Sequence, residues 1–225
     1  MVEGTYSTTV PPVWTVYTIS VRECWILINA MVGKGYLPQS TVSPTVTEEY
    51  AGIVYDLDGT LVRLAVDWEA ATEEVATIFR EANLEPPGDL WTMLDVAPEY
   101  DVADAVERTV AKHERAGARD SIRLDLADEL VAMDRPVGIC SLNAESACRM
   151  ALEEHGLEDA VDTVVGRDTV PQRKPDPEPL LAAIDRLSMR PSAVIFVGDT
   201  ETDAETALRA GTAFRFVDET ASNTN

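Results

Sequence analysis

The chain has 225 residues, of which 45% are hydrophobic, so it is long and apolar enough to bury a sizeable core. It carries 40 acidic and 18 basic residues, for a formal net charge of -22. Such a charge repels the phosphates of nucleic acids and the head groups of anionic lipids. We therefore expect no nucleic-acid partner and no membrane partner.

The basic residues are unevenly chosen, because only three of the 18 are lysine and the other 15 are arginine. An acid excess with scarce lysine is similar to the composition of salt-adapted proteins, whose surface carboxylates form a solvated, screened coat. We therefore expect a halophilic protein in which most Asp and Glu residues have no chemical role. We expect a monomer or a homodimer, and the sequence does not choose between them.

Cysteine usage indicates a reducing compartment. Cys24, Cys140 and Cys148 show no metal-ligand spacing, and an odd count does not suggest a disulfide framework. Cys140 lies within an apolar run, where an inert buried thiol is expected rather than a nucleophile. We expect the protein to be cytoplasmic.

The first 50 residues differ from the rest of the chain. Their apolar stretches are interrupted by Arg22 and Glu23 before they could span a bilayer, and their start lacks the basic residues of a secretory signal. We interpret residues 1–50 as a poorly ordered extension, or as the result of a mis-assigned start with Met31 as the genuine one.

Strand and helix patterns alternate after residue 50. Five short apolar runs are typical of strands covered on both faces, and they span residues 53–55, 137–140, 161–165, 193–197 and 213–217. Three helical patterns with stop signals lie between the later runs, at residues 144–155, 179–187 and 203–210. The order predicts an α/β fold: a doubly wound parallel sheet, with a Rossmann-like core formed by residues 51–65 and 135–217 and a tail at 218–225.

Residues 66–134 break this alternation and predict an inserted helical cap. Apolar residues recur at helical spacing over 68–82, after an Asp67 cap, and over 102–110, and residues 124–133 form a third candidate helix. A block inserted after the first strand would lie over the C-terminal end of that strand, as a lid. Substrate specificity is expected here, with four candidate side chains in or beside the block: Arg63, Trp68, Trp91 and Tyr100.

Asp56 and Asp58 directly follow the first predicted strand. Two carboxylates this close repel each other unless a cation, a proton or a polar ligand offsets the repulsion, and open α/β sheets place their sites at this edge. In so acidic a chain such a pair also arises by chance. The pair indicates a metal and a substrate only together with other residues.

Three later segments supply those residues. Ser141 ends the second strand of the core, Lys174 lies in a proline-containing loop, and Asp199 ends a third strand with Asp203 one helical turn further on. In a parallel sheet all of them project from the same edge. Carboxylates, a hydroxyl and an ammonium group are what phosphoryl transfer through a covalent intermediate needs, and oxygen ligands suit Mg²⁺.

The order and spacing of these segments resemble the haloacid dehalogenase (HAD) superfamily over residues 51–217. The matching segments are Asp56-Leu57-Asp58-Gly59-Thr60, Ser141, Lys174 and the run Gly198-Asp199-Thr200-Glu201-Thr202-Asp203. The resemblance is to phosphoglycolate phosphatase-like members with a helical cap. It implies a magnesium-dependent phosphatase that acts on a small phosphorylated metabolite.

The same resemblance implies roles for individual residues. Asp56 would be the nucleophile that forms an aspartyl-phosphate, and Asp58 the acid that protonates the leaving group and then activates water. Ser141 and Lys174 would bind the phosphoryl group. Many relatives follow the hydroxyl residue directly with Asn, whereas here Leu142 intervenes, so the role of Asn143 stays open.

The magnesium site that the resemblance implies is formed by acidic residues: Asp56, Asp58 through its backbone carbonyl, Asp199 and, directly or behind these ligands, Asp203. Dehalogenases and cation-pumping ATPases of the superfamily lack a carboxylate at the position of Asp58, so dehalogenation is disfavoured. Two alternatives stay open: a phosphomutase of the β-phosphoglucomutase type, and a non-catalytic phosphometabolite-binding protein. The substrate itself is not evident from the sequence.

Overall fold

The computed structural model describes residues 50–217 of the chain. The expected extension, apart from Tyr50, and the tail at 218–225 lie outside the described residues, as does Cys24. Within residues 50–217, no helix is both long enough and apolar enough to cross a membrane.

A five-stranded parallel sheet forms the centre of this region. In spatial order its strands are β5 (Thr163–Val165), β4 (Val137–Cys140), β1 (Gly52–Tyr55), β6 (Val194–Gly198) and β7 (Ala213–Phe216). Among the described residues, the chain enters the sheet at its middle strand, β1, and the later strands extend the sheet on both sides. The expected doubly wound α/β sheet is confirmed, and the strand order changes direction at β1, where such sheets place their sites.

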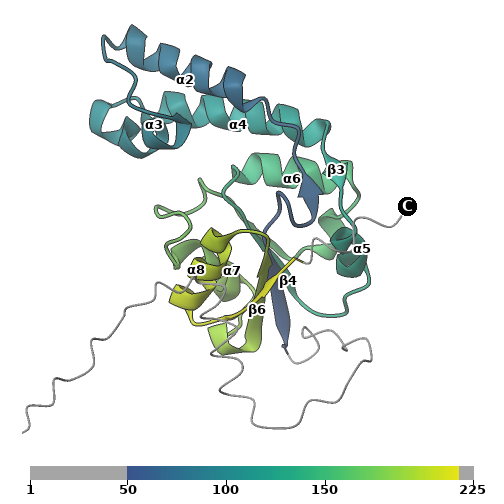
Figure 1. The fold of residues 1–225 in the computed structure, drawn as a ribbon. Helices are drawn as coiled ribbons and strands as arrows, with labels where there is room; N and C mark the ends of the chain where they lie inside the picture. The colour runs from purple at the N-terminus through teal and green to yellow at the C-terminus, as the bar shows by residue number, and fades with distance from the viewer. Residues whose placement is uncertain (1–49, 218–225) are drawn as a thin grey trace, which may run out of the picture. The chain divides into compact units, whose positions relative to one another are not determined.

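Helices cover both faces of the sheet, as the near-continuous apolar strands require. Helices α5 (Leu126–Val131) and α6 (Glu145–Glu154) share one core cluster with Ile53, Tyr55 and Ile139. Helices α7 (Glu178–Arg186) and α8 (Glu201–Ala210) contact each other and lie on the other side in Figure 1. Short 3₁₀ turns, η3 (Glu158–Ala160) and η4 (Pro191–Ala193), precede β5 and β6.

The helical insert, defined here as residues 68–119, has a core of its own. It consists of α2 (Trp68–Glu81), α3 (Leu90–Val96), the 3₁₀ turn η2 (Ala97–Tyr100) and α4 (Ala103–Arg119). Its helices α2 and α4 run side by side (Figure 1) around a separate apolar cluster that includes Val75, Phe79 and Val110. Asp67 caps α2 as expected, because its side chain accepts from the Ala70 N–H at 2.9 Å.

The insert begins and ends beside a two-stranded antiparallel ribbon of β2 (Val62–Arg63) and β3 (Ile122–Arg123). This pairing returns the chain to the sheet before α5 begins. The helix expected within 124–133 is thus α5, and its Ala127 and Leu130 side chains pack in the core cluster of the sheet rather than among α2, α3 and α4. The expected cap, residues 66–134, therefore includes one helix, α5, that packs against the sheet.

Candidate active site

Asp56 and Asp58 lie where β1 ends, in different surroundings. Asp56 is 5% exposed, and its N–H donates to the Val197 carbonyl at 2.8 Å, which holds it beside β6. Asp58 lies in the following turn, is less buried, and its carboxylate accepts from the Leu64 N–H at 2.9 Å. Burial raises the pKa of Asp58 although the Leu64 N–H opposes the shift. The two neighbours are therefore chemically distinct.

Gly59 allows the turn after β1 to approach the end of β6. Its φ of +87° is one that L side chains rarely adopt, and a Cβ there would lie 2.2 Å from the Asp199 carboxylate oxygen Oδ2. Any side chain at this position would push the turn and Asp199 apart. Glycine at position 59 is what brings Asp199 to Asp56 and Asp58.

Lys174 reaches the site from the loop between β5 and α7. Its buried ammonium donates to Asp56 Oδ1 at 2.8 Å, to Asp203 Oδ1 at 2.5 Å and to the Cys140 carbonyl at 3.2 Å. Burial alone would lower the pKa of Lys174, but Asp56 and Asp203 outweigh it, and the pKa lies above its ordinary value. Lys174 is therefore a charged group fixed among carboxylates.

Asp199 and Asp203 come from the junction of β6 and α8. Asp199 is exposed, whereas Asp203 is fully buried in the first turn of α8. Asp203 Oδ2 accepts from Thr200 N at 3.1 Å and from Thr200 Oγ1 at 2.6 Å, and Thr200 Oγ1 in turn accepts from Asp203 N. This capping box starts α8 at Glu201, two residues before the expected start at 203.

The carboxylates of Asp56, Asp199 and Asp203 can hold a metal ion, because one oxygen from each lies within 4.8 Å of the others. Oxygen-only donors fit a hard divalent cation such as Mg²⁺. Asp203 already has both oxygens hydrogen-bonded, to Lys174 and Thr200, so Asp56 and Asp199 are the freer ligands. The side chain of Asp58 is not part of this group.

The electrostatics of this acidic group favour a cation. Burial raises the pKa of Asp56 to about 7; Lys174 opposes this shift, while Asp203 and Asp199 add to it. Burial and the neighbouring Asp203 also raise the pKa of Asp199. A cation placed among these carboxylates would stabilise their charged forms.

Ser141 directly follows β4 at the same sheet edge and is buried. Its N–H donates to the Val165 carbonyl at 3.0 Å, and its hydroxyl donates to Asn143 Oδ1 at 3.1 Å. The neighbouring Cys140 carbonyl accepts from Lys174. Ser141 thus lies next in sequence to a residue that contacts Lys174, but its own hydroxyl bonds Asn143.

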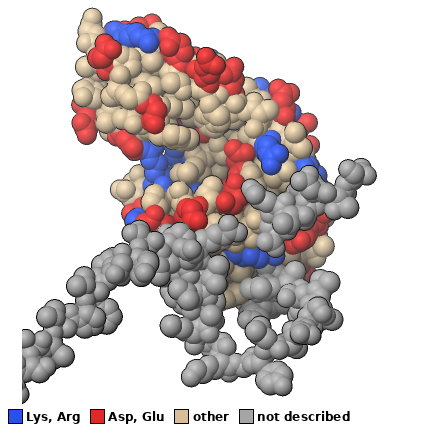
Figure 2. Space-filling model, in the orientation of Figure 1, with Lys and Arg blue, Asp and Glu red and all other residues tan. Residues whose placement is uncertain are grey.

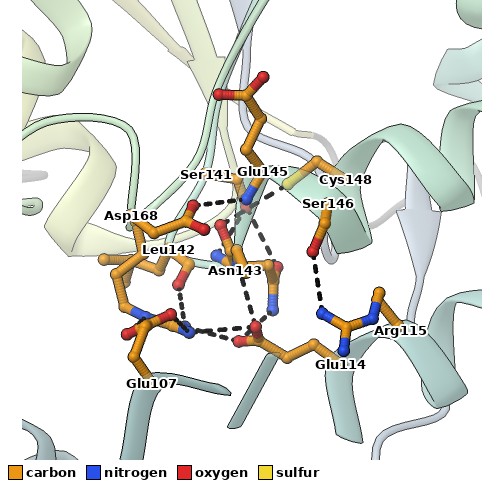
Figure 3. Close-up of polar contacts among 12 residues, drawn as sticks. Glu107, Glu114, Arg115, Ser141, Leu142, Asn143, Glu145, Ser146, Cys148 and Asp168 are labelled. Carbon is orange, nitrogen blue, oxygen red and sulfur yellow. Dashed lines mark hydrogen bonds and ion pairs between the residues drawn. The ribbon is translucent and has the colours of Figure 1, made fainter. Parts of the chain in front are cut away.

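A second charged cluster lies between the insert and the loops that follow β4 and β5 (Figure 3). Glu107 and Glu114 of α4 both pair with Arg167, which follows β5. Sequence reasoning did not single out these residues. The one available signal was the position of Arg167 just after a predicted strand, where polar residues at the sheet edge are informative.

The aromatic candidates in the insert each contact another aromatic ring, although Trp91 and Tyr100 remain 43% and 45% exposed. The Trp68 and Trp91 rings lie 5.7 Å apart, and the Tyr100 ring meets Phe79 edge-on at 6.1 Å.

Figure 2 shows Lys and Arg side chains in a hollow of the drawn face below the insert, among surrounding Asp and Glu. Basic side chains gathered in a hollow of an acidic molecule suit an anionic ligand.

Comparison with known proteins gives consistent matches. The family model described as haloacid dehalogenase-like hydrolase matches residues 95–217. A phosphoglycolate phosphatase of Cereibacter sphaeroides is 32% identical over 194 residues, which cover 72% of this chain and 83% of the relative. One of Rhodospirillum rubrum is 33% identical over 183 residues, covering 71% and 76%.

A solved structure has a similar fold. CbbY from Rhodobacter sphaeroides, in complex with phosphate, is 16% identical with a TM-score of 0.56, covering 78% of this chain and 89% of that protein. At this identity the likeness shows the fold alone. It agrees with the α/β sheet and flanking helices described above.

Proposed function

Because this chain belongs to the family of haloacid dehalogenase-like hydrolases and is a phosphatase, we propose that it hydrolyses a small phosphorylated metabolite with Mg²⁺ through an aspartyl-phosphate on Asp56. The observation that carries the proposal is the group at the sheet edge, in which the buried Asp56 and Asp203 both contact the buried Lys174 and Asp199 lies within reach of a shared cation. Charges are buried in this way only when paired or ligated.

In the first step an Asp56 carboxylate oxygen attacks phosphorus, and the bond from phosphorus to the leaving oxygen breaks. Lys174 fixes the orientation of the Asp56 carboxylate by donating to Oδ1. Its positive charge also offsets the negative charge of the phosphoryl group. Asp58 gives its proton to the leaving oxygen. The raised pKa of Asp58 supports this role, because a larger fraction of the carboxyl then carries the proton that a general acid must donate.

In the second step water attacks phosphorus, its proton passes to Asp58, and phosphate leaves as the Asp56 carboxylate is restored. A bound Mg²⁺ would supply charge neutralisation for the phosphoryl oxygens. Asp56 and Asp199 would hold it, with the Asp58 carbonyl, and Asp203 would orient Lys174 from behind. Ser141 would donate to a phosphoryl oxygen.

The substrate we propose first is phosphoglycolate, since that is the compound named for the relatives at 32% and 33% identity. The enzyme would work in the cytoplasm, as a monomer or a homodimer, at high ionic strength.

Release of inorganic phosphate from p-nitrophenyl phosphate tests the reaction, followed by a panel of phosphoglycolate, sugar phosphates and pyrophosphate. We expect release that needs Mg²⁺ and that chelation abolishes. Asp58→Ala should retain the fold and lose turnover. Absence of turnover with every ester by the folded protein would overturn the proposal, and interconversion of sugar phosphates without net release would identify a mutase instead.

A further inference from the structure

Glu114 is a buried charge that the reaction scheme leaves unused, as is its partner Arg167. Glu114 is 0% exposed, although the other buried residues of α4 are apolar or glycine. A carboxylate is held in such a place only when its oxygens are paired and hydrogen-bonded. Its partners therefore show what it is there to hold.

All these partners belong to the sheet side of the molecule (Figure 3). Glu114 Oε2 accepts from the Ala144 N–H at 3.0 Å, and Oε1 accepts from Asn143 Nδ2 at 3.3 Å. Arg167 Nη1 donates to Oε1 at 2.6 Å and also to the Leu142 carbonyl at 2.7 Å. One carboxylate of the insert thus holds residues 143 and 144 directly and residue 142 through Arg167.

The donor and acceptor in each hydrogen bond of this network follow from the groups involved. An ionised carboxylate only accepts, so the Asn143 amide must turn its NH₂ to Glu114 and its Oδ1 to Ser141. The Asn143 N–H donates to Ser141 Oγ at 3.2 Å. The Ser141 hydroxyl thus donates its proton to Asn143 Oδ1 and accepts from the Asn143 N–H. If the proton rotates about the Cβ–Oγ bond toward another acceptor, it leaves Oδ1, and the bond from the Asn143 N–H still holds the oxygen.

We propose that Glu114 is a positioning residue for phosphoryl binding, which acts through Asn143 to place the hydroxyl of Ser141 and so links the helical insert to the phosphoryl site. This rests on the proposed function, in which Ser141 binds the phosphoryl group. It also gives Asn143 a role: its side chain is committed to Ser141 and Glu114 and braces the loop rather than contacting substrate.

Glu107 provides a matched control on the same helix. It pairs with Arg167 at 2.6 Å, two turns from Glu114, and it has no hydrogen bond to residues 141–144 among the described contacts of residues 50–217. Its side chain is 32% exposed. A variant of Glu107 disturbs Arg167 but not the link through Asn143.

The experiment is a double-mutant cycle on the affinity for inorganic phosphate, measured by titration calorimetry with Mg²⁺ present, and on KM and kcat for p-nitrophenyl phosphate. Glu114→Gln puts an NH₂ against existing donors, and we expect phosphate affinity to fall roughly tenfold, with a rise in KM larger than the fall in kcat. In the Ser141→Ala background the same change should cost less than about twofold. Glu107→Gln should change affinity less than about twofold in either background.

Asn143→Ala serves as the second variant, because it leaves the Glu114 to Arg167 ion pair in place and so protects against failure to fold. Asn143→Ala should lower phosphate affinity as much as Glu114→Gln does. This loss of affinity should also vanish in the Ser141→Ala background. Equal losses with and without Ser141, or wild-type affinity in both variants, would overturn the proposal. So would phosphate binding by Ser141→Ala that equals the wild type.

The outcomes separate this inference from the proposed function. A wild-type protein that binds phosphate but hydrolyses no ester would refute the function, and the cycle of phosphate affinities would still decide the role of Glu114. A wild-type protein that hydrolyses esters, with a Glu114→Gln variant indistinguishable from it, would refute only the role of Glu114. Failure of the wild type to bind phosphate would refute the role of Glu114, and ester hydrolysis would then decide the proposed function by itself.

Discussion

Residues 50–217 bury two ion clusters that each place one cation among carboxylates, and the clusters differ in how many hydrogen-bonding groups stay available to a ligand. Lys174 is a compact charge that touches one oxygen of Asp56 and one of Asp203, with Asp199 nearby and exposed. The planar guanidinium of Arg167 donates to Glu107, Glu114 and the Leu142 carbonyl. The first cluster keeps ligand capacity, whereas the second is satisfied internally.

The pKa directions agree with this contrast. Burial would lower the pKa of Arg167, but Glu107 and Glu114 outweigh it and raise the pKa above its ordinary value, so the guanidinium stays charged. At the sheet edge burial outweighs Lys174 and raises the pKa of Asp56 to about 7. An unbalanced cluster is suited to chemistry, and a balanced one to holding elements together.

The largest expected effect is on chemistry at the first cluster. Asp56→Asn should lower the rate of phosphate release roughly 10⁴-fold or more, because the nucleophile is removed. The fold should persist, since the amide replaces a carboxylate whose burial is costly. Initial rates and urea unfolding check both statements. Asp128→Asn, at a surface ion pair, is the control, and appreciable turnover by Asp56→Asn would contradict the assignment.

The next effect is on stability at the second cluster. Arg167→Met should lower the free energy of unfolding by about 3–5 kcal/mol, because Glu114 is left buried without its cation. Arg209→Ala, which breaks an exposed i,i+4 pair with Glu205, should cost less than about 1 kcal/mol. Urea unfolding of both variants makes the comparison, and similar losses would show that burial does not distinguish the two pairs.

A smaller effect concerns protons and metal at the first cluster. A protonated Asp56 must lose its proton to bind Mg²⁺, so affinity should rise roughly tenfold from about pH 6 to about pH 8 if its pKa is about 7. Titration calorimetry at several pH values measures this. Asp199→Asn should bind more weakly but keep the pH dependence, and Asp56→Asn should lose it. A wild-type affinity independent of pH would contradict the prediction.

The smallest expected effect separates both buried clusters from the surface. If the acid excess is an adaptation to salt, activity should be several-fold higher at about 2 M KCl than in dilute buffer, because salt screens exposed charges. The loss caused by Arg167→Met should be the same at both salt concentrations, since that cluster is buried. Full activity in dilute buffer would count against the salt adaptation.

The sequence by itself determined the sheet and the position of its site. Apolar runs and helix stops specify the alternation of strands and helices, and a parallel sheet then brings the ends of β1, β4 and β6 to one edge. Asp56, Ser141 and Asp199 follow those strands directly, so their proximity depends only on local pattern and topology. The start of α8 could also have been predicted from the sequence, because Thr200 and Asp203 have the spacing of a capping box.

Only the tertiary structure decided which charges pair. Lys174 meets Asp56 across 118 residues of sequence, and Arg167 meets Glu114 across 53. Periodicity assigns a residue to an element and a face, but it does not name a partner on another element. The same limit explains α5, whose amphipathic pattern fits packing against either the insert or the sheet. The β2–β3 ribbon returns the chain to the sheet before α5 begins, and this contact between distant segments makes the choice.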